Sequence, residues 1–335
     1  MPTTSGAERP VRLRAFGRAI ADWGRSGTDE SRSDDGEKGD KAGESVGEGA
    51  LDTGPEVNTG WLRPELPWRH TRDPWAILVS EVMAQQTQVG RVIPAYERFM
   101  ERFPMPSSCA DAPLGEVLRA WAGLGYNRRA RFLHRAAQAM VDDHEGRVPN
   151  TLADLLALPG VGEYTARAVL VFAYEADIGV VDTNAGRVLS RAVAGRVLTR
   201  PEAQALVDAM VPPGQGWLFG QSLLDLGALV CAGANPACHR CPVRRRCRWA
   251  AAGHSDPDPS RGSAGVSAAQ SAFHGSDRQG RGRLLSALRR GPVYSVDLAE
   301  VMGWPDDGER ARRVASGLAA EGLVRHRRSG LLELP

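Results

Sequence analysis

Three observations predict a mainly α-helical fold. Between residues 61 and 174, apolar residues recur at helical spacing in successive segments, and no convincing alternating strand interrupts them. One segment, residues 75–89, is apolar on nearly every face as far as Ala84, so it must be surrounded by protein, yet it carries the carboxyl group of Glu81. Further along, four of the five cysteines crowd into seventeen residues. A buried acid and a group of thiols indicate a functional site.

Composition and charge narrow the class of protein. The chain has 335 residues, 42% hydrophobic and 24% charged, which is enough for two or three globular domains. It has no apolar run of membrane-spanning length and no signal-peptide core, so we expect a cytoplasmic protein that binds no membrane. Residues 27–57 hold ten acids and three bases, which leaves a net charge of +9 on the other residues. This basic body suggests an anionic partner such as nucleic acid, although basic surfaces also occur on proteins that bind none.

The segment 75–89 carries a polar seam if it is one continuous helix. Gln85 and Gln88 follow Glu81 at helical spacing, so an acid and two amides would share one face. Burial in an apolar helix raises the pKa of a carboxyl group, which would let Glu81 hold a proton at neutral pH. The alternative is a structural glutamate held in the core by hydrogen bonds to neighbouring amides.

A tight turn with two glycines joins two of the predicted helices. Further helices are expected at residues 91–103, 114–122, 128–143, 151–157 and 163–174. The last two are joined by Leu-Pro-Gly-Val-Gly at residues 158–162, and Tyr164 opens the second. Gly160 and Gly162 would let backbone N–H groups and the helix N-terminus point at an anion such as a DNA phosphate. The turn therefore predicts a helix-hairpin-helix motif, with an ordinary αα-hairpin as the alternative.

A second carboxyl group lies just ahead of another helix. Asp182 precedes the helix predicted at residues 185–193, where the helix dipole favours its ionised form, so we expect its pKa to be low. Two carboxyl groups whose environments separate their pKa values suit cleavage of a glycosidic bond, one as acid and one as the anion that stabilises a sugar cation. A plain helix N-cap is the alternative for Asp182.

The grouped cysteines follow the apolar helix predicted at residues 217–230. They are separated by six, two and five residues: Cys231, Cys238, Cys241 and Cys247. Four thiolates in one loop can hold a [4Fe–4S] cluster or a structural zinc ion, and spacing alone leaves both open. Arg244, Arg245 and Arg246 in the same loop place positive charge where a phosphate backbone could dock, or they form a solvated basic loop.

Together these motifs resemble the adenine DNA glycosylase family of the MutY type. The Glu81 segment, the glycine hairpin, Asp182 and the cysteine spacing occur in the expected order, and the resemblance covers residues 11–24 and 61–250. It implies a helix-hairpin-helix DNA glycosylase fold with a six-helix barrel and an iron–sulfur domain that holds a [4Fe–4S] cluster. It implies a monomer that removes adenine mispaired with 8-oxoguanine or guanine from double-stranded DNA, as part of base excision repair.

The resemblance also implies roles for single residues. The implied catalytic set, in which Glu81 protonates adenine and Asp182 stabilises the sugar cation, is Glu81, Asp182, Tyr164 and Asn184. The implied adenine pocket is Leu66, Trp68, Arg69 and Asp225. The implied DNA-contacting residues are Gln85, Gln86, Thr87 and Tyr126 at the opened base pair, with Gly160, Gly162, Arg244, Arg245 and Arg246 on the backbone. Core packing is the alternative for Leu66, Trp68 and Tyr126.

Two other functions compete with this one. An endonuclease III-like enzyme would act on oxidised pyrimidines and attack the sugar with a hairpin lysine, but Tyr164 occupies that position. The only lysines are Lys38 and Lys41. Glu81 also argues against that enzyme, which has an apolar residue there, and retention of Glu81 with Asp182 argues against a noncatalytic module. One departure from the family pattern is Asn127, where the family often has a second tyrosine.

The predicted organisation has six parts, listed by range: an N-terminal helix that packs on the iron–sulfur domain (1–24), a disordered acidic insert (25–60), the barrel (61–185), the iron–sulfur domain (186–251), a linker (252–275) and a small winged-helix-like module (276–335). The last part is too short for the Nudix-like domain of many family members. Its six arginines are expected to contact phosphates, or only to solvate the module: Arg310, Arg312, Arg313, Arg325, Arg327 and Arg328.

Overall fold

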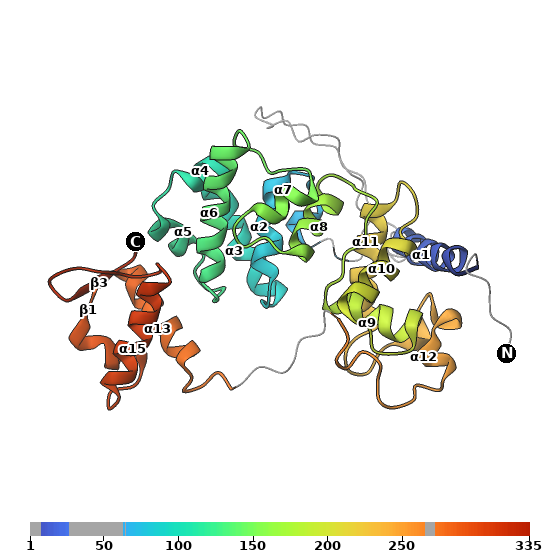
Figure 1. Ribbon diagram of the computed structural model, residues 1–335. Coiled ribbons are helices and arrows are strands. Elements are labelled where there is room, and N and C mark those ends of the chain that lie inside the picture. Colours follow the sequence, from blue (N-terminus) through green and yellow to red (C-terminus); the bar gives the residue numbers. More distant parts are fainter. Residues whose placement is uncertain (1–7, 27–62, 64, 265–271) are drawn as a thin grey trace, which may run out of the picture. The chain divides into compact units, whose positions relative to one another are not determined.

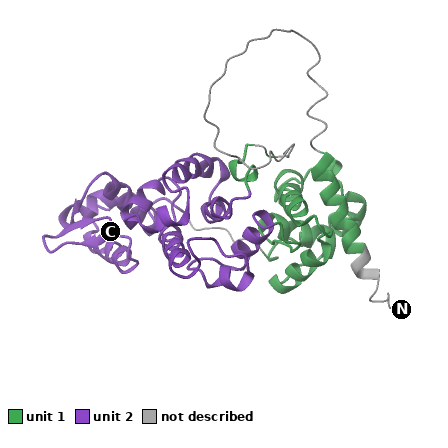
Figure 2. Ribbon diagram, turned by 90° about the horizontal axis from the view of Figure 1, so that it is seen from above, with its two compact units in different colours: residues 1–71, 175–267 green, residues 72–174, 268–335 purple. Residues whose placement is uncertain are grey.

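The computed structural model is mainly helical and describes residues 8–26, 63, 65–264 and 272–335 (Figure 1). It forms two compact units, residues 1–71 with 175–267 and residues 72–174 with 268–335, drawn in green and purple in Figure 2. Among the described residues, no helix is long and apolar enough to span a membrane. The acidic insert expected at residues 25–60 lies outside the described residues from residue 27 onward.

Unit 1 packs its helices around one apolar core. Its elements are α1 (Glu8–Ser26), η2 (Pro67–Arg69), α9 (Thr183–Val188), η3 (Leu189–Ala194), α10 (Arg200–Met210), α11 (Gly216–Asp225), η4 (Leu226–Val230), η5 (Cys238–Arg240), η6 (Arg244–Arg246) and α12 (Arg248–Ala251). Phe16 and Ile20 of α1 join Leu189, Val207 and Leu223 in this core. The amphipathic first helix therefore lies on α10 and α11, and π-helical turns extend α9 and α11.

Unit 2 contains a helical barrel built around one buried helix. Its first elements are α2 (Pro74–Ala84), α3 (Val89–Arg102), α4 (Pro106–Ala110), α5 (Leu114–Ala120), α6 (Arg128–Asp143), α7 (Leu152–Ala157) and α8 (Glu163–Phe172). The Asp73 carboxylate caps α2 by accepting the N–H groups of Trp75 and Ala76. Every α2 residue from Trp75 to Met83 except Glu81 is buried, which confirms that this helix is surrounded by protein.

The prediction of one continuous helix over residues 75–89 is wrong. α2 ends at Ala84, Gln85 leaves the helix with φ −56° and ψ 116°, and Gln88 precedes α3 instead of continuing α2. The reason is a side chain from α6: Arg129 donates to the carbonyl oxygens of Val82, Met83 and Gln85. These bonds satisfy carbonyl groups that a longer helix would have used. Glu81, Gln85 and Gln88 therefore do not form one helical seam.

The second part of unit 2 is a small α/β module. Its elements are α13 (Asp277–Arg290), β1 (Val293–Tyr294), η7 (Ser295–Asp297), α14 (Leu298–Met302), α15 (Gly308–Ala320), β2 (Arg325–His326) and β3 (Leu331–Glu333). The strands form an antiparallel sheet in the order β1-β3-β2, with Val293 opposite Leu332 and Arg325 opposite Glu333. A helix, a strand, two helices and a hairpin follow one another in this order, as in a winged-helix-like module.

Half of the arginines expected to grip phosphates have partners inside the module. Arg310 stacks on Trp304 at 4.1 Å and bonds to Asp277 at 2.8 Å, and Arg313 reaches the same carboxylate at 3.3 Å. Arg327 pairs with Glu333 at 2.7 Å. The side chains of Arg312, Arg325 and Arg328 are exposed and form no such ion pair or ring contact with the described residues, so they stay available for the expected phosphate contacts.

Residues 252–264 do not behave as the expected linker. Ser260 and Ser263 are buried, the Ser263 hydroxyl accepts the N–H of Leu198, and Ala264 N–H donates to the Leu198 carbonyl. Asp258 pairs with buried Arg191 at 2.5 Å. Hydrogen bonds and an ion pair, rather than burial of apolar side chains, therefore hold this segment against the rest of unit 1. Because those bonds use Ser and Asp side chains, the composition of the segment resembles that of a linker. Residues 265–271 lie outside the described part.

Candidate active site and nucleic-acid interface

The hairpin between α7 and α8 has the geometry of an anion-binding turn. Gly160 has φ +79°, and a Cβ there would lie 2.5 Å from the Phe132 Cβ, so only glycine fits. Gly162 precedes α8, where no side chain caps the helix and a Cβ would meet open space. The ten-residue α8 therefore presents an uncapped N-terminus at an exposed turn, as the two glycines predicted. Tyr164 lies in the first turn of α8 and is half-buried.

Two further turns of unit 2 are held together by Arg129. Besides the α2 carbonyls, its guanidinium donates to the Thr87 hydroxyl at 3.0 Å and to the Gly125 carbonyl at 3.4 Å. Gln86 and Tyr126, one in each turn, adopt left-handed φ values of +53° and +44°. Burial lowers the pKa of Arg129 to about 10, which leaves it charged at neutral pH. Sequence analysis missed Arg129, because nothing in its spacing distinguishes it from the other arginines.

The residues predicted to contact DNA differ in how exposed they are. Gln85 is half-buried and donates its amide to Thr165 Oγ1 of α8 at 3.1 Å, so it ties the turn to the helix that follows the hairpin. Gln86 is exposed, and Tyr126 is 40% exposed. Arg244, Arg245 and Arg246 are also exposed, in a short turn between two cysteines of unit 1.

Asp182 caps α9 and is held on both oxygens. Oδ1 accepts the N–H of Ala185 at 2.7 Å, and Oδ2 accepts the Asn184 side-chain amide at 3.0 Å. Asp182 is therefore the N-cap residue of α9, which was the structural alternative for this residue. The expectation of a low pKa is wrong: burial raises the pKa of Asp182 and outweighs the stabilisation of its anion by these donors and by Arg187.

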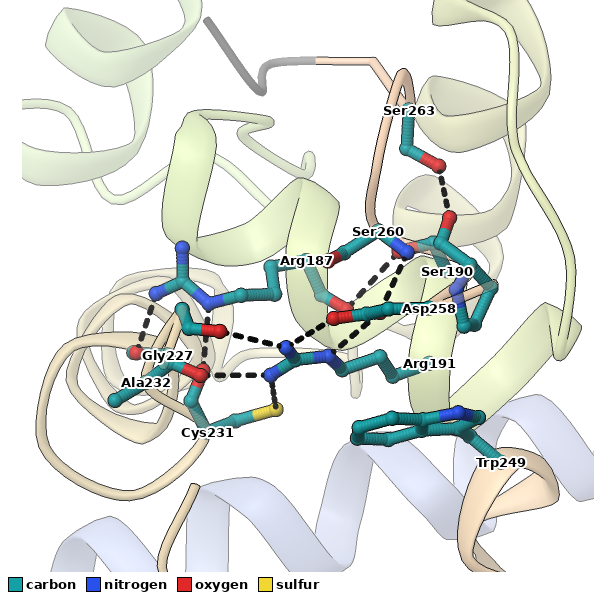
Figure 3. A network of polar contacts seen from close by, with 12 residues as sticks. Arg187, Ser190, Arg191, Gly227, Cys231, Ala232, Trp249, Asp258, Ser260 and Ser263 are labelled. Carbon is teal, nitrogen blue, oxygen red and sulfur yellow. Dashed lines mark hydrogen bonds and ion pairs between the residues drawn. The ribbon is translucent and has the colours of Figure 1, made fainter. Parts of the chain in front are cut away.

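Asn184 links Asp182 to the cysteine loop through Arg187. The Asn184 Oδ1 accepts from Arg187 Nη2 at 2.7 Å, and Arg187 Nε donates to the carbonyl oxygen of Cys231 at 2.6 Å. Arg187 Nη2 also donates to the Gly227 carbonyl at 2.6 Å (Figure 3). Asp182, Asn184, Arg187 and Cys231 therefore form a continuous hydrogen-bonded chain within unit 1. Arg187 was not singled out from the sequence.

Two of the four predicted adenine-pocket residues meet in a buried ion pair. Arg69 Nη1 and Nη2 donate to the two Asp225 oxygens at 2.6 and 2.7 Å, with side chains 4% and 2% exposed. A bidentate pair of this kind is strongly directional, and loss of one partner would leave a buried charge. Leu66 is buried and Trp68 half-buried beside it in sequence. The pair fixes the short helix η2 onto α11.

The four grouped cysteines line one small, mostly apolar cavity of unit 1. Its apolar walls come from Val188, Ala192, Leu226, Val230 and Val243. Among the described residues, no three His, Cys, Asp or Glu side chains stand close enough to hold a metal ion as placed. All four thiols are free, and burial raises the pKa values of Cys231, Cys247 and, to about 11, Cys241. The metal centre therefore stays a prediction.

Buried Arg191, which also lines this cavity, bonds to the chain around the first cysteine (Figure 3). Its guanidinium donates to the carbonyls of Ala232 at 2.7 Å and Gly233 at 3.0 Å, and lies 3.6 Å from Cys231 Sγ. It also stacks on the Trp249 ring at 4.6 Å. A buried cation that donates toward a sulfur suits a site for thiolate ligands, because it stabilises their negative charge.

Glu81 and Asp182 belong to different units, so the position of each carboxyl group is described within its own unit. Glu81 is half-buried on α2 of unit 2, in the same unit as Tyr164, Gln85, Thr87 and Tyr126. Asp182 and Asn184 lie in unit 1 with the Arg69–Asp225 pair and the cysteines. The structure thus joins Asp182 with Asn184, and Arg69 with Asp225, by direct bonds.

The fold is that of the helix-hairpin-helix base-excision DNA glycosylases. Residues 79–211 match the model of the HhH-GPD superfamily of base excision DNA repair proteins. A thermostable thymine-DNA glycosylase has the same fold, with a TM-score of 0.56, 25% identity, and 73% of this chain and 98% of that chain covered. A trapped endonuclease III–DNA covalent intermediate gives a TM-score of 0.51 at 24% identity, over 58% and 93% of the two chains.

Within this class, sequence similarity identifies the family. The chain is 42% identical to the adenine DNA glycosylase of Mycobacterium tuberculosis over 280 residues, which cover 81% of this chain and 89% of the relative. The chain therefore belongs to the adenine DNA glycosylase family and is a DNA N-glycosylase.

Because the pKa of Asp182 is raised, replacing its carboxylate with a neutral side chain should stabilise the folded protein at neutral and alkaline pH. A carboxyl group whose pKa is raised by folding destabilises the folded state at pH values above its ordinary pKa of 3.8, and has no such effect below it. We expect Asp182→Asn to melt at a higher temperature than the parent at pH 8, with the difference vanishing near pH 4. Melting curves across this range, with exposed Asp142→Asn as control, would contradict the account if Asp182→Asn were the less stable protein at pH 8.

Proposed function

We propose that the protein is a monofunctional adenine glycosylase that acts as a monomer on double-stranded DNA in the cytoplasm. It removes adenine opposite 8-oxoguanine or guanine. The observation that carries this proposal is the presence, in a chain of the adenine DNA glycosylase family, of one acid on a buried helix and a second acid anchored at a helix N-terminus. These are the two groups that acid-assisted cleavage of a glycosidic bond requires.

The proposed reaction starts with extrusion of the adenine from the duplex, because a stacked base hides its glycosidic bond. Glu81 gives a proton to an adenine ring nitrogen, and the electrons of the breaking bond between C1′ and the base pass to the adenine. The Asp182 carboxylate stabilises the oxocarbenium ion that remains on the sugar. Water then adds to C1′ and releases a proton, so the products are free adenine and an intact strand with an abasic sugar.

The residues around Asp182 support this role. The Ala185 N–H and the Asn184 amide fix both carboxylate oxygens and leave little rotational freedom. Because burial raises the pKa of Asp182, these donors and Arg187 are needed to keep it ionised. A rigid, poorly solvated anion stabilises an adjacent cation more than a hydrated one does, because no solvent must reorganise.

We also propose that Cys231, Cys238, Cys241 and Cys247 hold a [4Fe–4S] cluster. The residues fit this group: four free thiols line one apolar cavity, Arg191 donates toward Cys231 Sγ, and the Ala250 N–H donates to Cys247 Sγ at 3.4 Å. Such donors to cluster sulfurs are typical of iron–sulfur sites. When bound, the cluster would cross-link the loop that presents Arg244, Arg245 and Arg246 to the DNA backbone.

The acid role of Glu81 is tested by a shape-preserving substitution. Glu81→Gln keeps the size and hydrogen-bonding capacity but cannot give up a proton, so excision should fall by about 10²–10⁴-fold or more. Mismatched duplex should bind with unchanged affinity. Single-turnover excision and duplex binding would be measured beside Glu97→Gln, an exposed α3 residue that serves as the matched control. Excision at the parent rate by Glu81→Gln would remove the basis of the proposal.

The cluster is tested by composition and colour. Protein purified without oxygen should be brown, with the broad visible absorption of a [4Fe–4S] centre and close to four irons per chain. Replacement of Cys238 by serine should lower the iron content, whereas replacement of Cys109, which lies in the other unit, should not. A colourless protein with one zinc ion per chain would show that the thiols form a structural zinc site instead.

The absence of lysine outside residues 38–41 predicts that the strand is left intact. A bifunctional enzyme attacks the sugar with an amine and cleaves the strand through a Schiff base, and Tyr164 cannot do this. The product should break only after heat or alkali. Borohydride added during turnover should trap no stoichiometric covalent complex; a trapped complex in high yield would refute the monofunctional assignment.

A further inference from the structure

The winged-helix-like module is fixed to the barrel by contacts at three places within unit 2. The Gly115 N–H donates to the Pro335 carbonyl at 2.8 Å, and a Cβ on Gly115 would lie only 2.6 Å from that oxygen. Arg131 of α6 donates to the Glu321 carbonyl at the end of α15. Arg289 of α13 reaches the end of α5 and the start of α6. Along the chain, the barrel residues in these contacts lie on both sides of the turn that carries Tyr126.

Arg289 makes the most specific of these contacts. Its Nε donates to the carbonyl of fully buried Leu118 at 2.9 Å, and its Nη2 donates to Asn127 Oδ1 at 2.6 Å. Asn127 stands directly before α6, where an asparagine normally caps the helix with its side chain, but here it makes no cap. Its amide oxygen accepts the hydrogen bond from Arg289 instead. This explains why an amide, rather than a second tyrosine, suits position 127 in this chain.

The turn needs such support, because its backbone is unfavourable by itself. Gly123 and Gly125 have φ values of +91° and +71°, and Tyr126 has φ +44°, which costs a residue with a Cβ about 1 kcal/mol or more. Arg129 holds the turn from the barrel side, because its guanidinium donates a hydrogen bond to the Gly125 carbonyl oxygen. Arg289 holds the turn from the module side. Arg278 of α13 also lies 3.5 Å from the Tyr126 hydroxyl.

We propose that Arg289 is a positioning residue through which the C-terminal module sets the turn 123–127 and presents Tyr126 for insertion into the duplex. The proposal rests on the proposed function, in which Tyr126 fills the space left by the extruded base. A turn that is already ordered loses less conformational freedom on insertion, so insertion is faster and more complete. The module would thus act on base extrusion, in addition to any phosphate contacts of its exposed arginines.

The test reads insertion separately from excision. A duplex carries 2-aminopurine beside an 8-oxoguanine paired with 2′-fluoroadenosine, which resists cleavage, so a fluorescence rise reports unstacking by the inserted side chain. Arg289→Ala should reduce that rise and slow single-turnover excision of ordinary adenine by about 10- to 100-fold. Its affinity for matched duplex should stay within about twofold, because phosphate contacts are unchanged. Tyr126→Ala should abolish the fluorescence rise.

Two variants separate positioning from general loss of structure. Arg290→Ala removes the neighbouring, exposed arginine, whose hydrogen-bond partner is the Ser286 hydroxyl at 3.4 Å, and should behave as the parent. Asn127→Ala leaves the Arg289 bond to Leu118 in place, so the module stays docked, but it should reproduce the insertion defect. If the two residues act together, the double variant should be no worse than the more affected single one.

Three results would overturn the inference. The first is a parental fluorescence rise with Arg289→Ala or Asn127→Ala. The second is an equal loss of affinity for matched and mismatched duplexes with Arg289→Ala while insertion is unchanged. That result would show that the module only contacts phosphates. The third is a parental rise with Tyr126→Ala. Failure of the parent to excise adenine would instead count against the proposed function, since the fluorescence assay does not depend on cleavage.

Discussion

Arginine side chains that bond to main-chain carbonyl groups at helix ends hold the described structure together. Arg129 donates hydrogen bonds to the last carbonyl oxygens of α2, and Arg289 donates to one near the end of α5. Arg187 and Arg191 donate to the carbonyl oxygens of Cys231 and Ala232. A guanidinium has five donors in a planar fork, so one side chain can satisfy several acceptors that a lysine amine could not reach together. The turns after α2 and α5 and the start of the cysteine loop each follow the end of a helix, and an arginine of this kind bonds to carbonyl oxygens at each of them.

Contacts of the same kind link Asp182, the proposed catalytic anion, to the cysteine loop. Asp182 is buried enough for its pKa to rise, so its anion depends on donors, and one of them, Asn184, is itself oriented by Arg187. Arg187 is in turn fixed by the carbonyls of Gly227 and Cys231. A disordered cysteine loop would release these carbonyls and loosen the carboxylate. A cluster in that loop therefore has a structural reason to affect excision without taking part in the bond-breaking step.

Sequence reasoning was sound where a local pattern decides the structure. The buried α2, the hairpin glycines, the N-cap geometry of Asp182 and the first amphipathic helix all follow from periodicity and capping within one segment. It failed where a distant side chain decides. The end of α2 depends on Arg129, 44 residues away from Gln85 along the chain, and the pKa of Asp182 depends on burial by the folded protein. The packing of residues 252–264 depends on polar bonds to Arg191 and Leu198, which composition cannot reveal.

The most direct test of the central claim is a comparison of substrates with the purified parent protein. Single-turnover cleavage would be measured after alkali treatment on duplexes that contain 8-oxoguanine:adenine, guanine:adenine, 8-oxoguanine:cytosine or thymine glycol:adenine. The proposed roles of Glu81 and Asp182 predict an abasic site at adenine in the first two duplexes and no reaction in the other two. Release of thymine glycol, or an unreactive adenine opposite 8-oxoguanine, would contradict the assignment of Glu81 and Asp182 to adenine excision.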